Sequence, residues 1–383
     1  MKRITALALA TALIWLVPAY AHADEAPSGV SITAPSAVLM EKSTGTILYE
    51  QEAHAQYEPA SVTKVMTLLL VMEAIDAGSL SWEDTVTASA YACSMGGSQI
   101  WLKENEHMSV SDMVKAVAVA SANDCAVALA EHLAGSEESF VERMNQRAAE
   151  LGMEHTVFHN CTGLPAEGHV SCAYDIALMS RELILNHPDI RQYTTIWMDT
   201  LRDGQFQLSN TNRLIFYYEG ATGLKTGSTD SALYCLSATA ERDGMELIAV
   251  VMHAPTSNDR FESAKALLNY GFANWALTPV YPDQAIPPVP VLLGQADTVQ
   301  PVPARECVIL LEKSKAGNVT TQITLADNVA APVEEGQKLG QLAVLVDGEQ
   351  VDAIDLVASA GVERLSVGDL FRGLLGRLFL QES

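Results

Sequence analysis

Basic residues are scarce in this 383-residue sequence: Lys and Arg number 23 against 47 Asp and Glu, a formal net charge of −24. Nucleic acids are bound largely through phosphate contacts from Lys and Arg, so this balance argues against a nucleic-acid partner. Charged residues make up only 18% of the chain and hydrophobic residues 49%. That composition supports a sizeable buried core, excludes general disorder and, at this length, favours two globular domains.

Cysteine is also sparse. Six cysteines without dense spacing do not indicate a small domain held together by disulfides. Four lie in or beside apolar runs and are expected to be buried thiols: Cys93, Cys125, Cys235 and Cys307. Cys161 and Cys172 flank a loop containing Gly and Pro, and whether they pair is left open.

The N-terminal apolar run is too short to span a bilayer comfortably. Met1-Lys2-Arg3 precedes the uncharged stretch Ile4 to Val17, which Pro18 ends, and Ala21-His22-Ala23 follows. This order predicts a secretory signal at 1–23 that is cleaved after Ala23, in preference to an uncleaved anchor. Its removal takes away two basic residues and no acidic one, so the charge becomes 21 − 47 = −26.

Metal and phosphate motifs are missing. The nine histidines are scattered without H-E-x-x-H or similar ligand spacing, which argues against zinc. Met95-Gly96-Gly97-Ser98 lacks the Gly-Lys-Ser/Thr ending of a phosphate loop and is interpreted as a loop bordering a cleft. No cofactor or metal is expected.

Apolar periodicity predicts an α+β fold. Residues 36–52 alternate like a β-hairpin, and 61–77 form an apolar stretch without Gly or Pro, as in a buried helix. Further helices are expected near 111–120, 124–133, 136–151, 173–186 and 260–272, and strands near 223–227, 232–240 and 246–253. Strands at both ends of the segment with helices between them predict one sheet built from both ends.

The remainder of the chain differs. Prolines recur from Pro279 to Pro303, and short Val- and Thr-rich runs continue to about Ala358, which predicts a small β-rich domain. We therefore expect a signal peptide at 1–23, a catalytic domain at 24–277 and a β-rich domain at 278–360. Residues 361–383 combine apolar residues near helical spacing with Arg364, Arg372 and Arg377. They favour an amphipathic helix lying on a membrane over one packed on the β-rich domain.

Three short motifs carry the chemistry. In Ser61-Val62-Thr63-Lys64, a helix places Ser61 and Lys64 on one face, so the lysine can deprotonate the serine if burial and the charge of Lys225 lower its pKa. Ser121-Ala122-Asn123 lies between two expected helices and offers a hydroxyl and an amide. Lys225-Thr226-Gly227 lies on an edge-type strand that can pair with an extended substrate. Backbone N–H groups of Ser61 and Ser228 could form an oxyanion hole.

These motifs, in this order, resemble those of serine acyltransferases that recognise D-alanyl-D-alanine. The longer stretches 59–67, 96–99, 120–124 and 210–227 resemble low-molecular-weight penicillin-binding proteins of the serine-type D-alanyl-D-alanine carboxypeptidase family. The similarity runs from Val30 through Phe272 and more loosely to the C-terminus. It implies a β-lactamase/transpeptidase-like catalytic domain, with an antiparallel sheet flanked by helices.

The resemblance assigns roles to individual residues. Ser61 would be the acylated nucleophile, Lys64 its general base, and Ser121 and Lys225 partners in proton transfer. Asn123, Thr226, Gly227 and Ser228 would bind the substrate. Arg260 occupies the place of an arginine that binds the terminal carboxylate through a bidentate fork, the alternative being a capping or surface arginine.

The implied activity is removal of the terminal D-alanine from peptidoglycan stem pentapeptides, with β-lactams acylating Ser61. The protein would be exported and attached peripherally to the outer face of the cytoplasmic membrane. A β-lactamase or DD-endopeptidase using the same residues is the nearest alternative, and a non-catalytic wall-binding protein would require a broken set of motifs.

Two patterns bear on that choice. Glu182 to Asn186 matches E-x-x-L-N, which in class A β-lactamases supplies a deacylating carboxylate, but here it lies within an expected helix and is interpreted as helical. Ser228 and Ser171-Cys172-Ala173 depart from what related sequences commonly show, without touching a proposed catalytic group.

Overall fold

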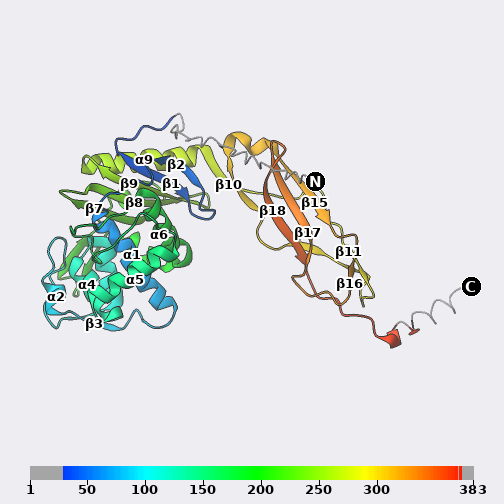
Figure 1. The fold of residues 1–383 in the computed structure, drawn as a ribbon, viewed down its shortest axis with the longest axis horizontal. Helices are drawn as coiled ribbons and strands as arrows, with labels where there is room; N and C mark the ends of the chain where they lie inside the picture. Colours follow the sequence, from blue (N-terminus) through cyan, green and yellow to red (C-terminus); the bar gives the residue numbers. More distant parts are fainter. Residues whose placement is uncertain (1–28, 370, 373–383) are drawn as a thin grey trace, which may run out of the picture.

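The computed structural model describes residues 29–369, 371 and 372 (Figure 1). The predicted signal peptide lies outside the described residues. Figure 1 shows a larger body of sheet and helices followed by a narrower body made mostly of strands. The catalytic motifs all belong to the first body.

A five-stranded antiparallel sheet organises the first body, in the order β2-β1-β9-β8-β7. Its strands are β1 Ser36–Glu41, β2 Ile47–Gln51, β7 Ala221–Thr229, β8 Leu233–Arg242 and β9 Met245–Ala254. The first hairpin joins the last strands through β1 and β9, with Ala37 opposite Val251. The sheet is thus built from both ends of the segment, as the sequence predicts, and β7 lies at its edge.

Both faces of the sheet are buried. Along β1, Val38 and Met40 belong to the core shared with the central helices, whereas Leu39 packs with α9, Ser257–Asn274, on the opposite face. Successive strand residues point to opposite faces, so a strand covered on both sides reads as a continuous apolar run. This explains the composition of β1 and β9.

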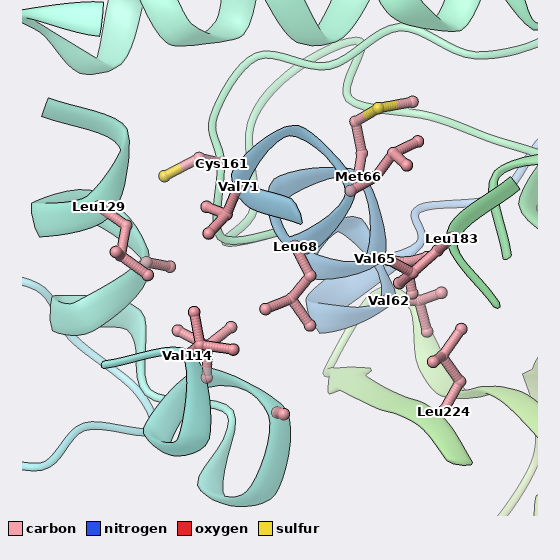
Figure 2. Packing of buried hydrophobic residues seen from close by; sticks show 14 of the residues in the cluster. Val62, Val65, Met66, Leu68, Val71, Val114, Leu129, Cys161, Leu183 and Leu224 are labelled. Carbon is pink, nitrogen blue, oxygen red and sulfur yellow. The ribbon is translucent and has the colours of Figure 1, made fainter. Parts of the chain in front are cut away.

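The helix that carries the first motif is buried on nearly all sides. A 3-10 turn, Ala60–Thr63, leads into α1, Lys64–Asp76. Figure 2 shows Val65, Leu68 and Val71 of α1 surrounded by side chains of other elements, among them Val114 and Leu129. The predicted helix is confirmed, with a tighter first turn that contains Ser61.

The other long predicted helices are also present. They are α3 Val110–Ala120, α4 Asn123–Ala134, α5 Glu137–Glu150 and α6 Ala173–Asn186. Short elements were not predicted, because three or four residues give no measurable periodicity. These are β3 Thr85–Thr87, α2 Ala90–Cys93, β4 His107–Ser109, a 3-10 turn Pro188–Ile190, α7 Arg191–Thr194, β5 Met198–Leu201, β6 Phe206–Ser209 and α8 Leu214–Tyr217.

The second body is β-rich, as expected. Strand β10, Trp275–Pro279, leaves α9 and pairs with β14, Val308–Glu312. The remaining strands form sheets ordered β13-β18-β17-β15 and β12-β11-β16. Their bounds are β11 Val289–Leu292, β12 Thr298–Val299, β13 Pro301–Pro303, β15 Val319–Leu325, β16 Val329–Ala330, β17 Lys338–Val346 and β18 Glu349–Ala358, with a 3-10 turn at Lys313–Asn318.

The expected amphipathic helix at 361–383 does not begin where the sequence suggested. Val362 pairs with Val333 in a β-bridge and is buried in a core of the second body, and Arg364 bridges Gly294. Backbone pairing therefore keeps this stretch extended, and helix first appears near residue 367. Residues 373–383 lie outside the described residues. No helix within the described part of the chain is long and apolar enough to cross a membrane.

Candidate active site

Ser61 and Lys64 meet as the first motif predicts. The Lys64 Nζ donates to Ser61 Oγ at 3.0 Å and to the backbone carbonyl of Thr162 at 2.7 Å. Lys64 is fully buried, and burial lowers the pKa of its ammonium to about 7. A substantial fraction of Lys64 is therefore uncharged near neutral pH, within hydrogen-bonding distance of the hydroxyl it would deprotonate.

The loop from Val157 to Val170 forms the floor beneath this pair. Gly163 has φ +79°, and a Cβ at this position would lie 1.8 Å from the Ala60 carbonyl oxygen. Only glycine allows this approach of two backbones. The loop thereby holds the Thr162 carbonyl against Lys64.

A neutral histidine fixes the same loop. His169 Nδ1 accepts from the His159 backbone N–H at 3.1 Å, so its proton is on Nε2, which donates to Thr63 Oγ1 at 2.8 Å. Burial, aided by His159, lowers the pKa of His169 to about 4. His169 therefore stays neutral in this arrangement at any pH near neutrality.

The second motif lies at the junction of α3 and α4, as predicted. Ser121 adopts a left-handed conformation, φ 63°, after the last turn of α3. Its Oγ is buried and has no hydrogen-bond partner among the described residues. The strained backbone and the unpartnered hydroxyl of Ser121 leave a group that is available to bind a ligand or to transfer a proton.

Asn123 is held by the loop that the sequence placed beside the cleft. Its Nδ2 donates to the Gly96 carbonyl at 2.7 Å, and its backbone N–H donates to the Ser98 carbonyl at 2.7 Å. Because Nδ2 is engaged, the buried Oδ1 faces no partner within the described chain and can accept from a substrate amide. The neighbouring Asp124, whose role was not predicted, accepts from the backbone N–H of Leu102 at 3.0 Å and anchors the continuation of that loop.

The third motif lies on the edge strand β7. Lys225 is 1% exposed, and burial, followed by the charges of Lys64 and Arg260, lowers its pKa well below the usual value. Burial lowers the pKa of Lys64, as expected, without the contribution that we also expected from Lys225. Gly227 packs so closely on the turn that contains Ser61 that a Cβ would lie 2.9 Å from the Ser61 nitrogen.

The side chains that follow Lys225 differ in exposure. Thr226 is buried, and its Oγ1 donates to Thr211 Oγ1 at 2.7 Å, which ties β7 to the segment after β6. Ser228 is exposed at the outer end of the motif. These positions leave the backbone edge of β7 beside Ser61.

Arg260 is neither a surface nor a capping residue. It lies in the first turn of α9, whose N-cap is Thr256, and only 8% of it is exposed. Its Nη1 donates to the Gly227 carbonyl at 3.0 Å, whereas the buried Nε has no partner in the described chain. Burial lowers its pKa to about 10. The guanidinium thus adjoins the Lys225-Thr226-Gly227 strand with donor capacity unused.

The structure also tests the predictions made for Glu182 and for the cysteines. Glu182 is within α6 and its Oε1 accepts from Arg147 Nη2 at 2.6 Å, so it is the ordinary helical glutamate that we predicted. All six cysteines are free, so Cys161 and Cys172 are unpaired. Cys93 and Cys307 are partly exposed, contrary to the expectation that they are buried.

Thr162, Gly163, His169 and Asp124 were missed as parts of the site. Each acts through a contact with a residue distant in sequence, such as Gly163 with Ala60. Periodicity and short motifs report local structure only. The single available signal was a Gly in a loop, which does not say what the loop approaches.

Comparisons with known proteins agree with this geometry. The family profile described as D-alanyl-D-alanine carboxypeptidase matches residues 21–256, and that of the penicillin-binding protein 5 C-terminal domain matches 277–364. The D-alanyl-D-alanine carboxypeptidase DacF of Bacillus subtilis (strain 168) is 42% identical over 357 residues, covering 91% of this chain and 92% of that protein.

Solved structures are similar as well. Penicillin binding protein 5 from Haemophilus influenzae superposes with a TM-score of 0.76 at 31% identity, covering 88% of this chain and 99% of that one. Penicillin-Binding Protein D2 from Listeria monocytogenes, in an ampicillin-bound form, matches with a TM-score of 0.56 at 35% identity. That match covers 64% of this chain and 99% of the Listeria chain.

Proposed function

The chain belongs to the serine D-alanyl-D-alanine carboxypeptidase family of low-molecular-weight penicillin-binding proteins, and from this premise we propose that it removes the terminal D-alanine from peptidoglycan stem peptides. The observation that carries the proposal is the 3.0 Å contact between the buried Lys64 amine and Ser61 Oγ. A weak nucleophile and a base with a pKa near 7 are thereby in place for acyl transfer at neutral pH.

The acylation step follows from the positions of these groups. Ser61 Oγ attacks the carbonyl carbon of the penultimate D-alanine while Lys64 accepts the hydroxyl proton. The backbone N–H groups of Ser61 and Ser228 stabilise the developing oxyanion. The peptide C–N bond then breaks, and the leaving amine of the terminal D-alanine receives a proton through Ser121 and Lys225.

Recognition uses groups that lie around the nucleophile. The substrate backbone pairs with the edge of β7, Asn123 Oδ1 accepts from a substrate amide, and Arg260 binds the terminal carboxylate. A free carboxylate distinguishes the end of a stem peptide from an internal bond, which gives an exopeptidase its selectivity. Water then attacks the acyl-Ser61 ester and releases the shortened peptide.

β-Lactams would follow the same path. Their strained amide and carboxylate mimic the acyl-D-Ala-D-Ala end, so Ser61 opens the ring and retains the product as a slowly hydrolysed ester. The ampicillin-bound form of the Listeria relative supports this part of the proposal.

Location and organisation complete the proposal. We place the mature chain outside the cytoplasm after cleavage at 1–23, with catalytic residues at 24–277 and a β-rich support at 278–360. Residues 361–383 would attach it peripherally to the outer face of the cytoplasmic membrane. The described start of this segment is extended, and helix is present from residue 367. Co-sedimentation with anionic vesicles, lost in a chain ending at 366 that keeps the bridges of Val362 and Arg364, tests this attachment.

The decisive test is release of free D-alanine from a pentapeptide ending in D-Ala-D-Ala by the purified chain. Ser61→Ala should abolish both release and labelling by a fluorescent penicillin. Rapid penicillin hydrolysis without D-alanine release would mean a β-lactamase instead. Neither activity in the unmodified chain would mean a non-catalytic wall-binding protein.

A second test addresses Arg260. Arg260→Ala should reduce D-alanine release much more than it slows penicillin acylation, because the peptide depends on the carboxylate contact for alignment. Arg143→Ala, an exposed arginine of α5, is the matched control and should change neither. Equal losses of both reactions in Arg260→Ala would remove its assigned role.

A further inference from the structure

Three potential metal ligands gather outside the acyl-transfer site. Ligand atoms of His54, His155 and Cys172 all lie within 4.8 Å of one another. His54 is exposed in the turn after β2, His155 is partly exposed after α5, and Cys172 is the buried N-cap residue of α6. None of the three contributes to the chemistry proposed above.

The backbone brings these residues together. Val157 and Val170 form an antiparallel bridge, and continuing that register by two residues places His155 opposite Cys172. The intervening hydroxyls of Thr156 and Ser171 are 2.8 Å apart, which supports this register.

The turn carrying His54 is held against the same pair. The Tyr174 backbone N–H donates to the Ala53 carbonyl at 3.0 Å, and the His54 ring lies 5.1 Å from the ring of His155. Three separate segments therefore converge on one point.

A buried carboxylate adjoins this cluster. Asp175 is 1% exposed, and its Oδ1 has no hydrogen-bond partner among the described residues. Its backbone N–H donates to Cys172 Sγ at 3.4 Å, and its Oδ2 accepts from the His155 backbone N–H at 2.8 Å. Asp175 is thus tied to both candidate ligands, through its backbone to Cys172 and through its carboxylate to the backbone of His155. An unpartnered buried carboxylate oxygen is costly unless a cation or donor compensates it.

We propose that His54, His155 and Cys172 bind a divalent transition-metal ion of the zinc class, with Asp175 as the neighbouring negative charge. Imidazole nitrogen and thiolate sulfur are preferred zinc ligands, and a water completes four-coordination. The Cys172 thiol loses its proton to solvent on binding. One thiolate and one carboxylate then balance the two positive charges.

The required movement is small. Ligand atoms around tetrahedral zinc are about 3.3–3.8 Å apart, as follows from metal–ligand distances of about 2.0–2.3 Å. The separations here are at most 4.8 Å. Because His54 is exposed, rotation of its side chain can shorten them without disturbing the core.

The site would act as a clamp on the active-site floor. His155 and Cys172 stand at the two ends of the loop that presents the Thr162 carbonyl to Lys64. His54 precedes the segment that leads to Ser61. The metal would join all three segments in the folded state only, and so stabilise the floor without taking part in catalysis.

A second cluster provides an internal contrast. Glu73, Glu182 and His187 also have ligand atoms within 4.8 Å of one another. Arg147 already bridges the two glutamates, with contacts of 2.7 and 2.6 Å. A cation is present there from the chain itself, so we infer no metal at that cluster.

Binding is tested on the purified, untagged chain with Zn²⁺ and with Co²⁺ as a spectroscopic substitute. We expect one Zn²⁺ per chain, and a thiolate-to-Co²⁺ charge-transfer absorption that is lost in Cys172→Ser. Serine keeps the N-cap of α6, so this variant should fold. His54→Gln should weaken binding at least about tenfold, whereas His132→Gln, at an exposed position of α4, should not.

Stability gives an independent measurement. Zn²⁺ at about 100 times its Kd should raise Tm by about 5–10 °C. The shift should vanish in Cys172→Ser, fall to about half or less in His54→Gln, and persist in His132→Gln and Glu73→Gln. The proposal is overturned by substoichiometric binding, by a Co²⁺ thiolate band that survives Cys172→Ser, or by an equal Tm shift in His54→Gln. If Cys172→Ser misfolds, His54→Gln decides alone, since its side chain is exposed.

Discussion

The two bodies of the molecule differ in what they bury. Among the described residues, every buried charged side chain precedes residue 275, including Lys64, Asp124, Lys225, Glu246 and Arg260. The β-rich body buries only apolar side chains in two cores, each built around eight residues. A buried charge persists only where surrounding packing holds it in place. The contrast places the buried charges in the same body as the three sequence motifs.

The largest expected effect comes from replacing a buried charged residue of the first body. Lys64→Met removes the base and a desolvated amine together, so the rate of penicillin acylation should fall on the order of 10³-fold, while Tm should not decrease. Stopped-flow acylation and thermal unfolding measure the two quantities. Lys265→Met, an exposed residue of α9 in a surface ion pair, is the control. A Lys64→Met variant that acylates at the original rate would exclude Lys64 as the base.

The next change probes the β-rich body. Ile354 is fully buried in one of its small cores. Ile354→Ala should lower the free energy of unfolding of that body by about 2–4 kcal/mol, whereas the acylation rate should stay the same. Hydrogen exchange resolved by segment separates the two bodies, and Val351→Ala, an exposed neighbour, should cost little. Loss of acylation in Ile354→Ala would show that the bodies are not independent.

The pH dependence of acylation tests the buried amine of Lys64 in the first body. The pKa of Lys64 is about 7 in the folded chain against 10.5 ordinarily. Acylation should therefore fall about tenfold per pH unit below about 7 and level off above it. The unfolded chain binds more protons between about 7 and 10.5, so the Lys64 contribution to stability rises with pH over that window. A pH-independent acylation rate between 5 and 7 would contradict the assignment.

The smallest effect is expected at Glu182. Because this α6 side chain pairs with Arg147 of α5, Glu182→Gln should change the lifetime of the penicilloyl-enzyme by less than about twofold and Tm only slightly. Rapid-quench measurement of deacylation tests this. A large increase in lifetime would revive the β-lactamase-like interpretation.

Sequence patterns anticipated the elements that extend over several turns or residues. The apolar stretch from Val65 to Met72 and the β-like run at 232–240 are local signals, and both the helix and the strand are where they were expected. The motif residues were also found, since their spacing is local. The loop from Val157 to Val170 beneath Ser61 and Lys64 was not anticipated, because the contact between Gly163 and Ala60 joins residues about a hundred positions apart.

The predicted helix at 361–383 was wrong at its start for a related reason. Val362 has a place in a helical pattern, yet a β-bridge with Val333 satisfies its backbone and buries its side chain. Tertiary pairing overrides periodicity at such positions. Likewise, scattered histidines in the sequence gave no sign that His54 and His155 lie side by side.

The edge position of β7 has a consequence for how such a protein can escape inhibition. A ligand that pairs with the strand contacts peptide groups, and a mutation alters side chains while leaving peptide groups in place. Gly227 cannot be enlarged without disturbing Ser61. If β-lactams pair with β7 as proposed, loss of drug binding has few single-step routes along this strand, and selection would act on the rate of ester hydrolysis or on protein abundance instead.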